Sequence, residues 1–331
     1  MRRASSRLAP FIMLAAALWL GGMLWESAET ITDLFRTIRP ERLATATVLI
    51  LLSLLTNGLI YALILRHASG VRIPFSRVLR IYFPSQIAKY LPGKVWGIIY
   101  PAERMAASVH PLHTWQANVE AIFWSMAQAV MVTVWLISWQ WGGGIGLLAG
   151  IGTLCALLVP AIRRGWVART ITGITGRLFP GITGRAGTPT GKGSMCLLIL
   201  LLLDTVLYIT AWRNMLPAGS DLGEAWTMAS AYLLAWSAGV LVFIVPNGAF
   251  VREAGFVAVG TLFGAPRDQL LFYAALARAL FMAADIAAAL LALAAARIIP
   301  ATSPTPVPHE RSLSERPAIS AQEHRPSPPA T

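Results

Sequence analysis

The sequence predicts an all-α integral membrane protein: a polytopic helical bundle of seven or eight transmembrane helices with two interrupted segments. Of its 331 residues, 56% are hydrophobic and 13% are charged, and the mean hydropathy is +0.61. Several separate apolar runs approach the length that crosses a bilayer. From residue 300 the composition changes to proline, serine and charge. We therefore divide the chain into a membrane domain, residues 1–299, and a disordered tail, residues 300–331.

The expected spans can be placed in order along the chain. Three arginines precede the first apolar run, which places the N-terminus in the cytoplasm if this run is a span and not a cleaved signal peptide. Basic clusters at 66–80 and 163–194 agree with this orientation, and a glycine turn at 142–144 joins the third and fourth spans. Tryptophans at 139, 212 and 226 fall at predicted outer ends, as an aromatic belt would place them. The expected spans are 8–25, 43–65, 115–139, 145–162, 195–212, 225–245 and 268–299.

Two apolar segments, 81–105 and 246–266, are too broken by proline and glycine to be continuous spans. Pro84, Pro92 and Pro101 are each expected to interrupt a helix in the first segment. Irregular backbone at membrane depth requires protein or a water-filled cavity to satisfy its polar groups, and paired interrupted segments indicate a transporter's binding site. Lys89 and Lys94 would face this cavity and favour a phosphate head group, although a lysine near a helix end also reaches the interface without any such role.

Charged residues inside the predicted membrane region form the second group of candidates. A charge at bilayer depth costs about 2.5 to 3.5 kcal/mol unless it is paired or hydrated, so these side chains should face the interior. They are a pathway for a head group or, alternatively, structural ion pairs between helices. Arg252 and Glu253 are adjacent and are expected to point to different sides of a helix, although Glu253 could simply complement a helix start. The intramembrane network is Glu120, Asp204, Arg278 and Asp285.

Two short motifs resemble those of the lysylphosphatidylglycerol synthase transmembrane-region family, whose members carry a flippase-like domain. The first is a polar residue, Gln86, followed by Leu-Pro-Gly at 91–93 and by Arg104; the second is the run at 246–254, PNGAFVREA. The resemblance implies a membrane domain that binds or moves lipid-linked substrates. Longer members carry a soluble aminoacyl-transfer domain, so lysyl transfer is not expected from this chain. The head-group residues are expected to be Gln86, Lys89, Lys94, Arg104, Asn247, Arg252 and Glu253.

Other classes of function lack the residues they would need. His110 and His113 have the spacing of a metal pair, but Pro111 lies between them and no acid or cysteine completes a set. The chain contains no Walker loop, no G-x-S-x-G and no H-E-x-x-H motif, so we expect no catalytic residues, no cofactor and no metal. Basic loops on a membrane protein indicate anionic lipid, so we do not expect nucleic-acid binding.

The sequence therefore predicts a multi-pass inner-membrane protein that binds and translocates an anionic lipid or an isoprenoid-phosphate-linked glycan. The alternatives are a membrane-embedded transferase, or an assembly subunit that partners a glycosyltransferase or forms a homo-oligomer. The lipid, the direction of movement, the energy source and the side of the C-terminus stay open.

Overall fold

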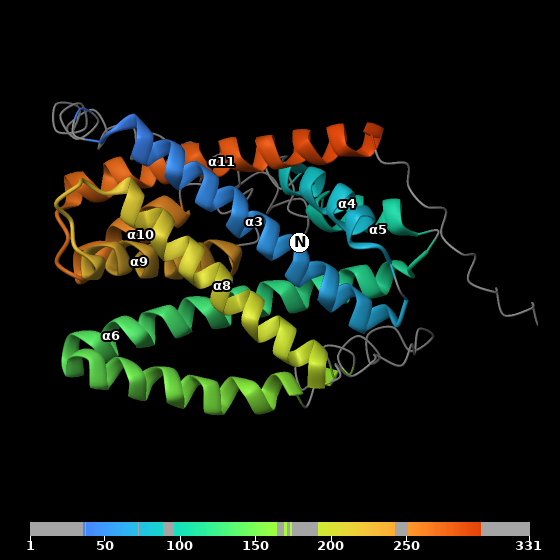
Figure 1. Ribbon diagram of the computed structural model, residues 1–331, viewed down its shortest axis with the longest axis horizontal. Coiled ribbons are helices and arrows are strands. Elements are labelled where there is room, and N and C mark those ends of the chain that lie inside the picture. The colour runs from blue at the N-terminus through green and yellow to red at the C-terminus, as the bar shows by residue number, and fades with distance from the viewer. Residues whose placement is uncertain are drawn as a thin grey trace, which may run out of the picture. The chain divides into compact units, whose positions relative to one another are not determined.

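Every regular element that the computed structural model describes is an α-helix (Figure 1). It describes residues 36, 38–71, 73–88, 96–106, 108–163, 169–170, 173, 191–241 and 251–298. The all-helical prediction is therefore confirmed for this part of the chain. The first expected span at 8–25 and the tail at 300–331 lie outside it. The helices are α3 (Pro40–Ser69), α4 (Phe75–Ala88), α5 (Trp96–Met105), α6 (Pro111–Arg163), α8 (Gly191–Met215), α9 (Leu222–Leu241), α10 (Val251–Leu262) and α11 (Arg267–Ile298).

Four of these helices have the length and composition needed to cross a membrane. They match the expected spans at 43–65, 115–139, 195–212 and 268–299, so the membrane prediction is confirmed at these four places. The total of seven or eight spans stays a prediction. The four segments are Pro40–Ser69, Pro111–Trp139, Gly193–Met215 and Arg267–Ala295.

The helix surfaces show the pattern expected in lipid, with apolar side chains outside and polar ones inside. On α3 large apolar residues are exposed at positions i, i+4 and i+7, whereas Ser53 between them is buried. The same spacing occurs on α8, where Asp204 is only 4% exposed. A polar group avoids hydrocarbon by facing the bundle interior. The exposed residues are Val48, Leu52 and Leu55 on α3, and Ile199, Leu203 and Val206 on α8.

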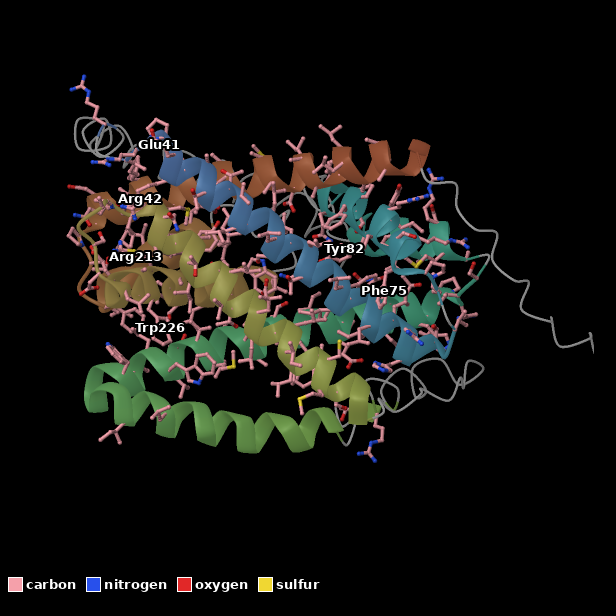
Figure 2. All side chains as sticks on the ribbon, viewed as in Figure 1. Glu41, Arg42, Phe75, Tyr82, Arg213 and Trp226 are labelled. Carbon is pink, nitrogen blue, oxygen red and sulfur yellow. The ribbon has the colours of Figure 1, made fainter. Side chains whose placement is uncertain are left out.

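Contacts between distant residues give the directions of the long helices. Arg42 near the start of α3 donates a hydrogen bond to the carbonyl of Arg213 near the end of α8, and the two lie together in Figure 2. Ser53 and Asp204 meet farther along the same pair, so α3 and α8 are antiparallel. Ile50 clusters with Ala284, and Leu54 packs against the cluster that contains Ala288 and Ala292, so α11 runs in the same direction as α3. The C-terminal ends of α3 and α11 therefore lie at the same end of the bundle. The sequence did not show this.

Helix α6 turns back on itself at a glycine, as the 142–144 run predicts (Figure 1). Gly143 has φ 54° and ψ −140°, which lies outside the helical region and which residues with a Cβ rarely adopt. The two arms of α6 pack closely against each other, because a Cβ on Gly150 would lie 2.7 Å from the Ser138 hydroxyl. The third and fourth expected spans are thus the two arms of a helical hairpin.

Helices α4 and α5 pack against each other, and the start of α4 and the end of α5 both lie near the C-terminal end of α3. Helix α4 runs back along α3, so that Tyr82 stacks on Tyr61 with ring centroids 5.1 Å apart. Gly58 permits this approach, because a Cβ there would lie 2.7 Å from Leu79 and 3.3 Å from Tyr82. The end of α5 returns to the cluster that contains the last turns of α3. The start of α4 and the end of α5 therefore both lie beside the last turns of α3. Residues 89–95, between the two helices, lie outside the described part of the chain.

Two details of the first interrupted segment differ from the sequence prediction. Pro84 lies inside α4 and Pro101 inside α5, so neither proline ends a helix. A proline within a helix removes one backbone hydrogen bond but need not stop the helix when neighbouring helices hold the segment. Helix α4 ends at Ala88 and α5 begins at Trp96, so the segment does form two separate helices, and Pro92 lies outside the described residues.

The second interrupted segment contributes the short helix α10, which lies between α9 and α11. Glu253 contacts Arg278 and Gly260 packs against Leu270, so α10 is antiparallel to α11. Gly255 packs against Ala235 and Phe256 against Tyr232, so α10 is antiparallel to α9 as well. The start of α9 and the end of α10 thus lie toward the end of the bundle where α3 begins, whereas the start of α4 and the end of α5 lie where α3 ends.

The prediction that tryptophans form an aromatic belt at the outer ends of the spans is wrong in part. Trp212 is fully buried and Trp226 is 8% exposed, because both pack into helix contacts, whereas Trp139 is exposed.

Candidate functional site

A buried charge network lies where α10 begins. The Arg252 guanidinium donates to Oε1 of Glu253 at 3.2 Å, and Arg278 of α11 donates to the same oxygen at 3.1 Å. Arg252 and Glu253 are 6% and 8% exposed. The expectation that these adjacent residues point to different sides is therefore wrong. Long side chains at the first turn of a helix can fold toward each other, and burial favours the contact.

The network lies inside the bundle, about a third of the way along α11. Arg278 is eleven residues after Arg267, the first residue of α11, which places it about 17 Å along the axis of this 32-residue helix. Helix α10 is twelve residues long, and Arg252 and Glu253 lie in its first turn. Transporters often build a binding site at the end of a short helix inside the bundle.

Aromatic side chains from three helices surround the network. The Arg252 guanidinium lies over the Tyr232 ring of α9, 5.0 Å from its centroid. Tyr232 in turn stacks with Phe281 of α11 at 5.7 Å and packs edge-to-face on Phe256 of α10 at 5.5 Å. The Tyr232 hydroxyl is buried and has no hydrogen-bond partner among the described residues. Buried polar atoms are normally paired, so this wall offers hydrogen bonds that a polar ligand could take up.

Asp285 adds a second carboxylate to this region. It lies on α11, two turns after Arg278, and is 2% exposed. Tyr232 is close enough to interact electrostatically with Arg252, Glu253, Arg278 and Asp285. Two formal positive charges and two formal negative charges thus surround one tyrosine. The region is a compensated network, in agreement with the ion-pair alternative for Arg278 and with Glu253 in the first turn of its helix.

A second buried carboxylate, Asp204 of α8, has a different environment. Its Oδ1 accepts hydrogen bonds from Ser53 at 2.6 Å and from Asn57 at 2.8 Å, both on α3. Its Oδ2 accepts one from the Gln128 amide of α6 at 2.9 Å, and that amide also donates to Thr205 at 3.0 Å. All of these partners are neutral. The alternative of a structural ion pair is therefore wrong for Asp204 within the described part of the chain.

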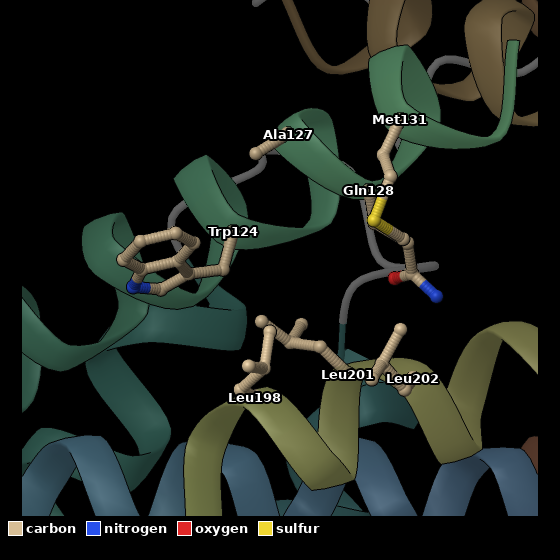
Figure 3. Close-up of a pocket in the computed structure, with 7 residues that line it drawn as sticks. All are labelled: Trp124, Ala127, Gln128, Met131, Leu198, Leu201 and Leu202. Carbon is tan, nitrogen blue, oxygen red and sulfur yellow. The ribbon is translucent and has the colours of Figure 1, made fainter. Parts of the chain in front are cut away.

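A small pocket lies between α6 and α8 beside this carboxylate (Figure 3). Its volume of about 10 Å³ is at the lower limit of what one water molecule needs, and the surface it exposes is apolar. Gln128 and Trp124 line it from α6, and the Trp124 indole donates to Glu120 at 3.3 Å. Glu120 thus also bonds to a neutral partner. The full lining is Trp124, Ala127, Gln128, Met131, Leu198, Leu201 and Leu202.

The other predicted head-group residues do not join the charge network in the described part of the chain. Lys89, Lys94 and Asn247 lie outside it. Gln86 is in the last turn of α4 and is partly buried. Arg104 is exposed in the last turn of α5, 5.5 Å above the Tyr100 ring, at the end of the bundle where α6 begins. The two motifs of the resemblance therefore place their arginines at different depths.

No group of three metal-ligating side chains occurs among the residues that the structure describes. His110 and His113 have ring centroids 6.3 Å apart, and Nδ1 of His113 lies 3.2 Å from the Gln116 side-chain oxygen. The pair therefore makes polar contacts with its own helix turn.

Sequence reasoning missed the neutral members of both clusters. Ser53 and Asn57 are spaced i, i+4 on an otherwise apolar stretch of α3, and Gln128 lies within the apolar first arm of α6. Polar side chains on one face of an apolar helix are a pattern that could have indicated a buried polar contact. Tyr232 and Tyr208 gave no comparable indication, because tyrosines are common in membrane helices.

Comparisons with known proteins identify no family for this chain: no family model, no curated protein and no solved structure matches it.

Proposed function

We propose that this chain is a multi-pass inner-membrane protein that binds an anionic, phosphate-bearing lipid at the Arg252–Glu253–Arg278 network and moves it between leaflets. The observation that carries the proposal is the sharing of one carboxylate oxygen by two arginines from different helices, inside the bundle. The lipid is a phospholipid or an isoprenoid-phosphate-linked glycan, as the resemblance implies. The N-terminus is cytoplasmic, and the bundle has seven or eight spans.

A phosphate fits this arrangement for two physical reasons. Arginine presents several N–H donors in a planar fork that suits phosphate oxygens, and two such groups face one acceptor here. The N-terminus of α10 adds the positive end of the helix dipole, which favours an anion. A phosphate that enters would replace or join Glu253 as the common acceptor. The Tyr232 hydroxyl offers a further hydrogen bond at the same place.

Direct binding is the first test. The purified protein is incorporated into nanodiscs that contain phosphatidylglycerol, and lipid that stays bound after exchange into a zwitterionic lipid is measured by mass spectrometry. We expect Arg278→Gln to lose bound anionic lipid and Arg278→Lys, which keeps the charge, to retain part of it. Arg267→Gln is the matched control, because Arg267 is an exposed arginine on the same helix. Equal retention by Arg278→Gln and Arg267→Gln contradicts the proposed site.

Movement is tested in vesicles with a fluorescent anionic lipid in one leaflet. We expect protein-dependent transfer to the other leaflet with no change in the mass of the lipid. A new covalent product supports the transferase alternative and contradicts the transport proposal. If neither transfer nor a product appears while the lipid remains bound, the assembly-subunit alternative is favoured and the translocation part of the proposal is wrong.

A further inference from the structure

We infer that Asp204 is a reversible proton-binding site that supplies the coupling ion for movement of the lipid. Its part in transport rests on the function proposed above, but proton binding itself is independent of any lipid. Asp204 is 4% exposed in a helix suited to the membrane, and its partners in the described residues are Ser53, Asn57 and Gln128. Neutral donors stabilise a carboxylate but leave its charge in place. In a membrane core, a proton is the simplest way to remove that charge.

The charged and titratable groups around Asp204 agree with this inference. Tyr82 of α4 and Tyr208 of α8 interact electrostatically with Asp204, and Tyr82 interacts also with Tyr61 of α3 and with Asp285 of α11. The direct hydrogen-bond partners from α3 and α6 are the uncharged Ser53, Asn57 and Gln128. Within the described part of the chain, no arginine, lysine or histidine forms an ion pair with Asp204. The site therefore changes its net charge by one when a proton binds.

The geometry favours a proton over a sodium ion. Asn57 and Gln128 turn amide nitrogens toward the carboxylate, whereas a bound sodium ion would require their oxygens. Rotating the Gln128 amide would break its bonds to both Asp204 and Thr205. Protonation needs less rearrangement, because the Ser53 hydroxyl can turn from donor to acceptor. A hydronium ion gives one proton to a carboxylate oxygen, an O–H bond forms, and one water molecule is left.

One face of α6 connects this site with the bundle surface. Glu120, Trp124 and Gln128 are spaced i, i+4, i+8 and therefore follow one line along the helix. Glu120 is partly exposed and accepts from Trp124, which lines the same pocket as Gln128. Figure 3 shows the Gln128 amide directed into the space between α6 and α8. This line leads from the partly exposed carboxylate of Glu120, past the small pocket, to Gln128, the partner of Asp204.

A tyrosine connects the proton site with the charge network. Tyr208 lies one turn after Asp204 on α8 and interacts electrostatically with both Asp204 and Arg252. Its ring also packs against Phe281, which stacks on Tyr232. Removing the negative charge of Asp204 would therefore change the field at Arg252 and alter how strongly the network holds an anion. This is a short physical route for coupling a proton to a lipid.

The test is infrared difference spectroscopy of the full-length protein in nanodiscs of zwitterionic lipid, titrated with acid. We expect a carbonyl band of a protonated carboxylic acid that shifts when the protein is made with carboxyl-labelled aspartate. Asp204→Asn should lose this band, and Glu224→Gln, which removes an exposed carboxylate on α9, should keep it. If Asp204→Asn does not fold, the Gln128→Leu variant keeps the carboxylate, and its band should shift in position because one hydrogen bond is lost.

The remaining outcomes separate the two proposals. A band that is unchanged in Asp204→Asn, or that is insensitive to the aspartate label, overturns the proton site. A band that disappears when sodium is added at constant pH shows competition by a metal cation and also overturns the inference as stated. In vesicles, Asp204→Asn should bind lipid but lose the dependence of lipid transfer on an imposed pH gradient. If the band is present but lipid transfer never occurs, the proton site stands and the transport function fails.

Discussion

Glu253 and Asp204 are both buried carboxylates in apolar helices, but their partners differ in kind. Glu253 accepts from two guanidinium groups, whereas Asp204 accepts from a hydroxyl and two amides. In the first site the two arginines are balanced by Glu253 together with Asp285. In the second the charge remains, and only a change of protonation removes it. Burial alone therefore does not reveal the role of an acidic residue in a membrane; the charge of its partners does.

The largest expected effect comes from neutralising the compensated site. Glu253→Gln leaves two arginines, one of them 6% exposed, without their common counter-charge. Breaking a buried ion pair typically costs 3–5 kcal/mol, and because the Arg278 side chain is 25% exposed we expect about 3 kcal/mol of lost unfolding free energy. Denaturant unfolding in one detergent measures this change. A loss below about 1 kcal/mol would show that the network is effectively solvated.

The next effect concerns packing beside Asp204. Gly58→Leu would push α4 away from α3, because even a Cβ lies 2.7 Å from Leu79 and 3.3 Å from Tyr82. Overpacking of this kind costs about 1–3 kcal/mol. The matched control is Gly152→Leu on α6, where a Cβ meets nothing within 4 Å. Equal unfolding free energies for the two variants would mean that α4 does not pack against α3 as described.

A smaller effect is expected when the uncompensated site is neutralised. Asp204→Asn keeps the shape of the side chain and removes a charge that has no cationic partner in the described residues. The remaining hydrogen bonds are rearranged, so we expect the unfolding free energy to change by less than about 1 kcal/mol. The same denaturant titration measures it. Destabilisation as large as that of Glu253→Gln would remove the distinction between the two sites.

The smallest effect is expected at Arg104, which lies outside both buried sites. Its side chain is exposed and stacks on Tyr100, and substitutions at such positions usually change stability by less than about 0.5 kcal/mol. Arg104→Gln should therefore unfold like the unmodified protein. A loss of 2 kcal/mol or more, on the scale of about 1–3 kcal/mol for a buried group left unsatisfied, would show that Arg104 contributes to a buried network after all.

The sequence predicted the elements of this fold better than the contacts between them. Apolar length gave the four membrane-compatible helices, and the glycine run gave the turn at Gly143, since both depend on local properties of the chain. The prediction that Pro84 and Pro101 interrupt a helix was wrong, because neighbouring helices can hold a helix together through a proline. No local sequence pattern reveals those neighbours. The direction of α11 likewise depends on distant contacts.

The candidate site was predicted only in its charged members. Arg252, Glu253 and Asp204 were noticed because a charge in an apolar run is conspicuous. Arg252 and Glu253 were expected to meet different partners, but they bond to each other, and the neutral partners of Asp204 were not predicted. Which charge meets which partner depends on helix packing, so the sequence could give the candidates but not their pairing.

A double-mutant cycle between Glu253 and Arg278 tests the central claim, that α10 and α11 are joined by a compensated buried charge network. Unfolding free energies are measured for the unmodified protein, Glu253→Gln, Arg278→Gln and the double variant. We predict a coupling energy of about 1–3 kcal/mol, because residues in one network do not contribute additively. A coupling energy indistinguishable from zero would contradict the network and, with it, the proposed anion site.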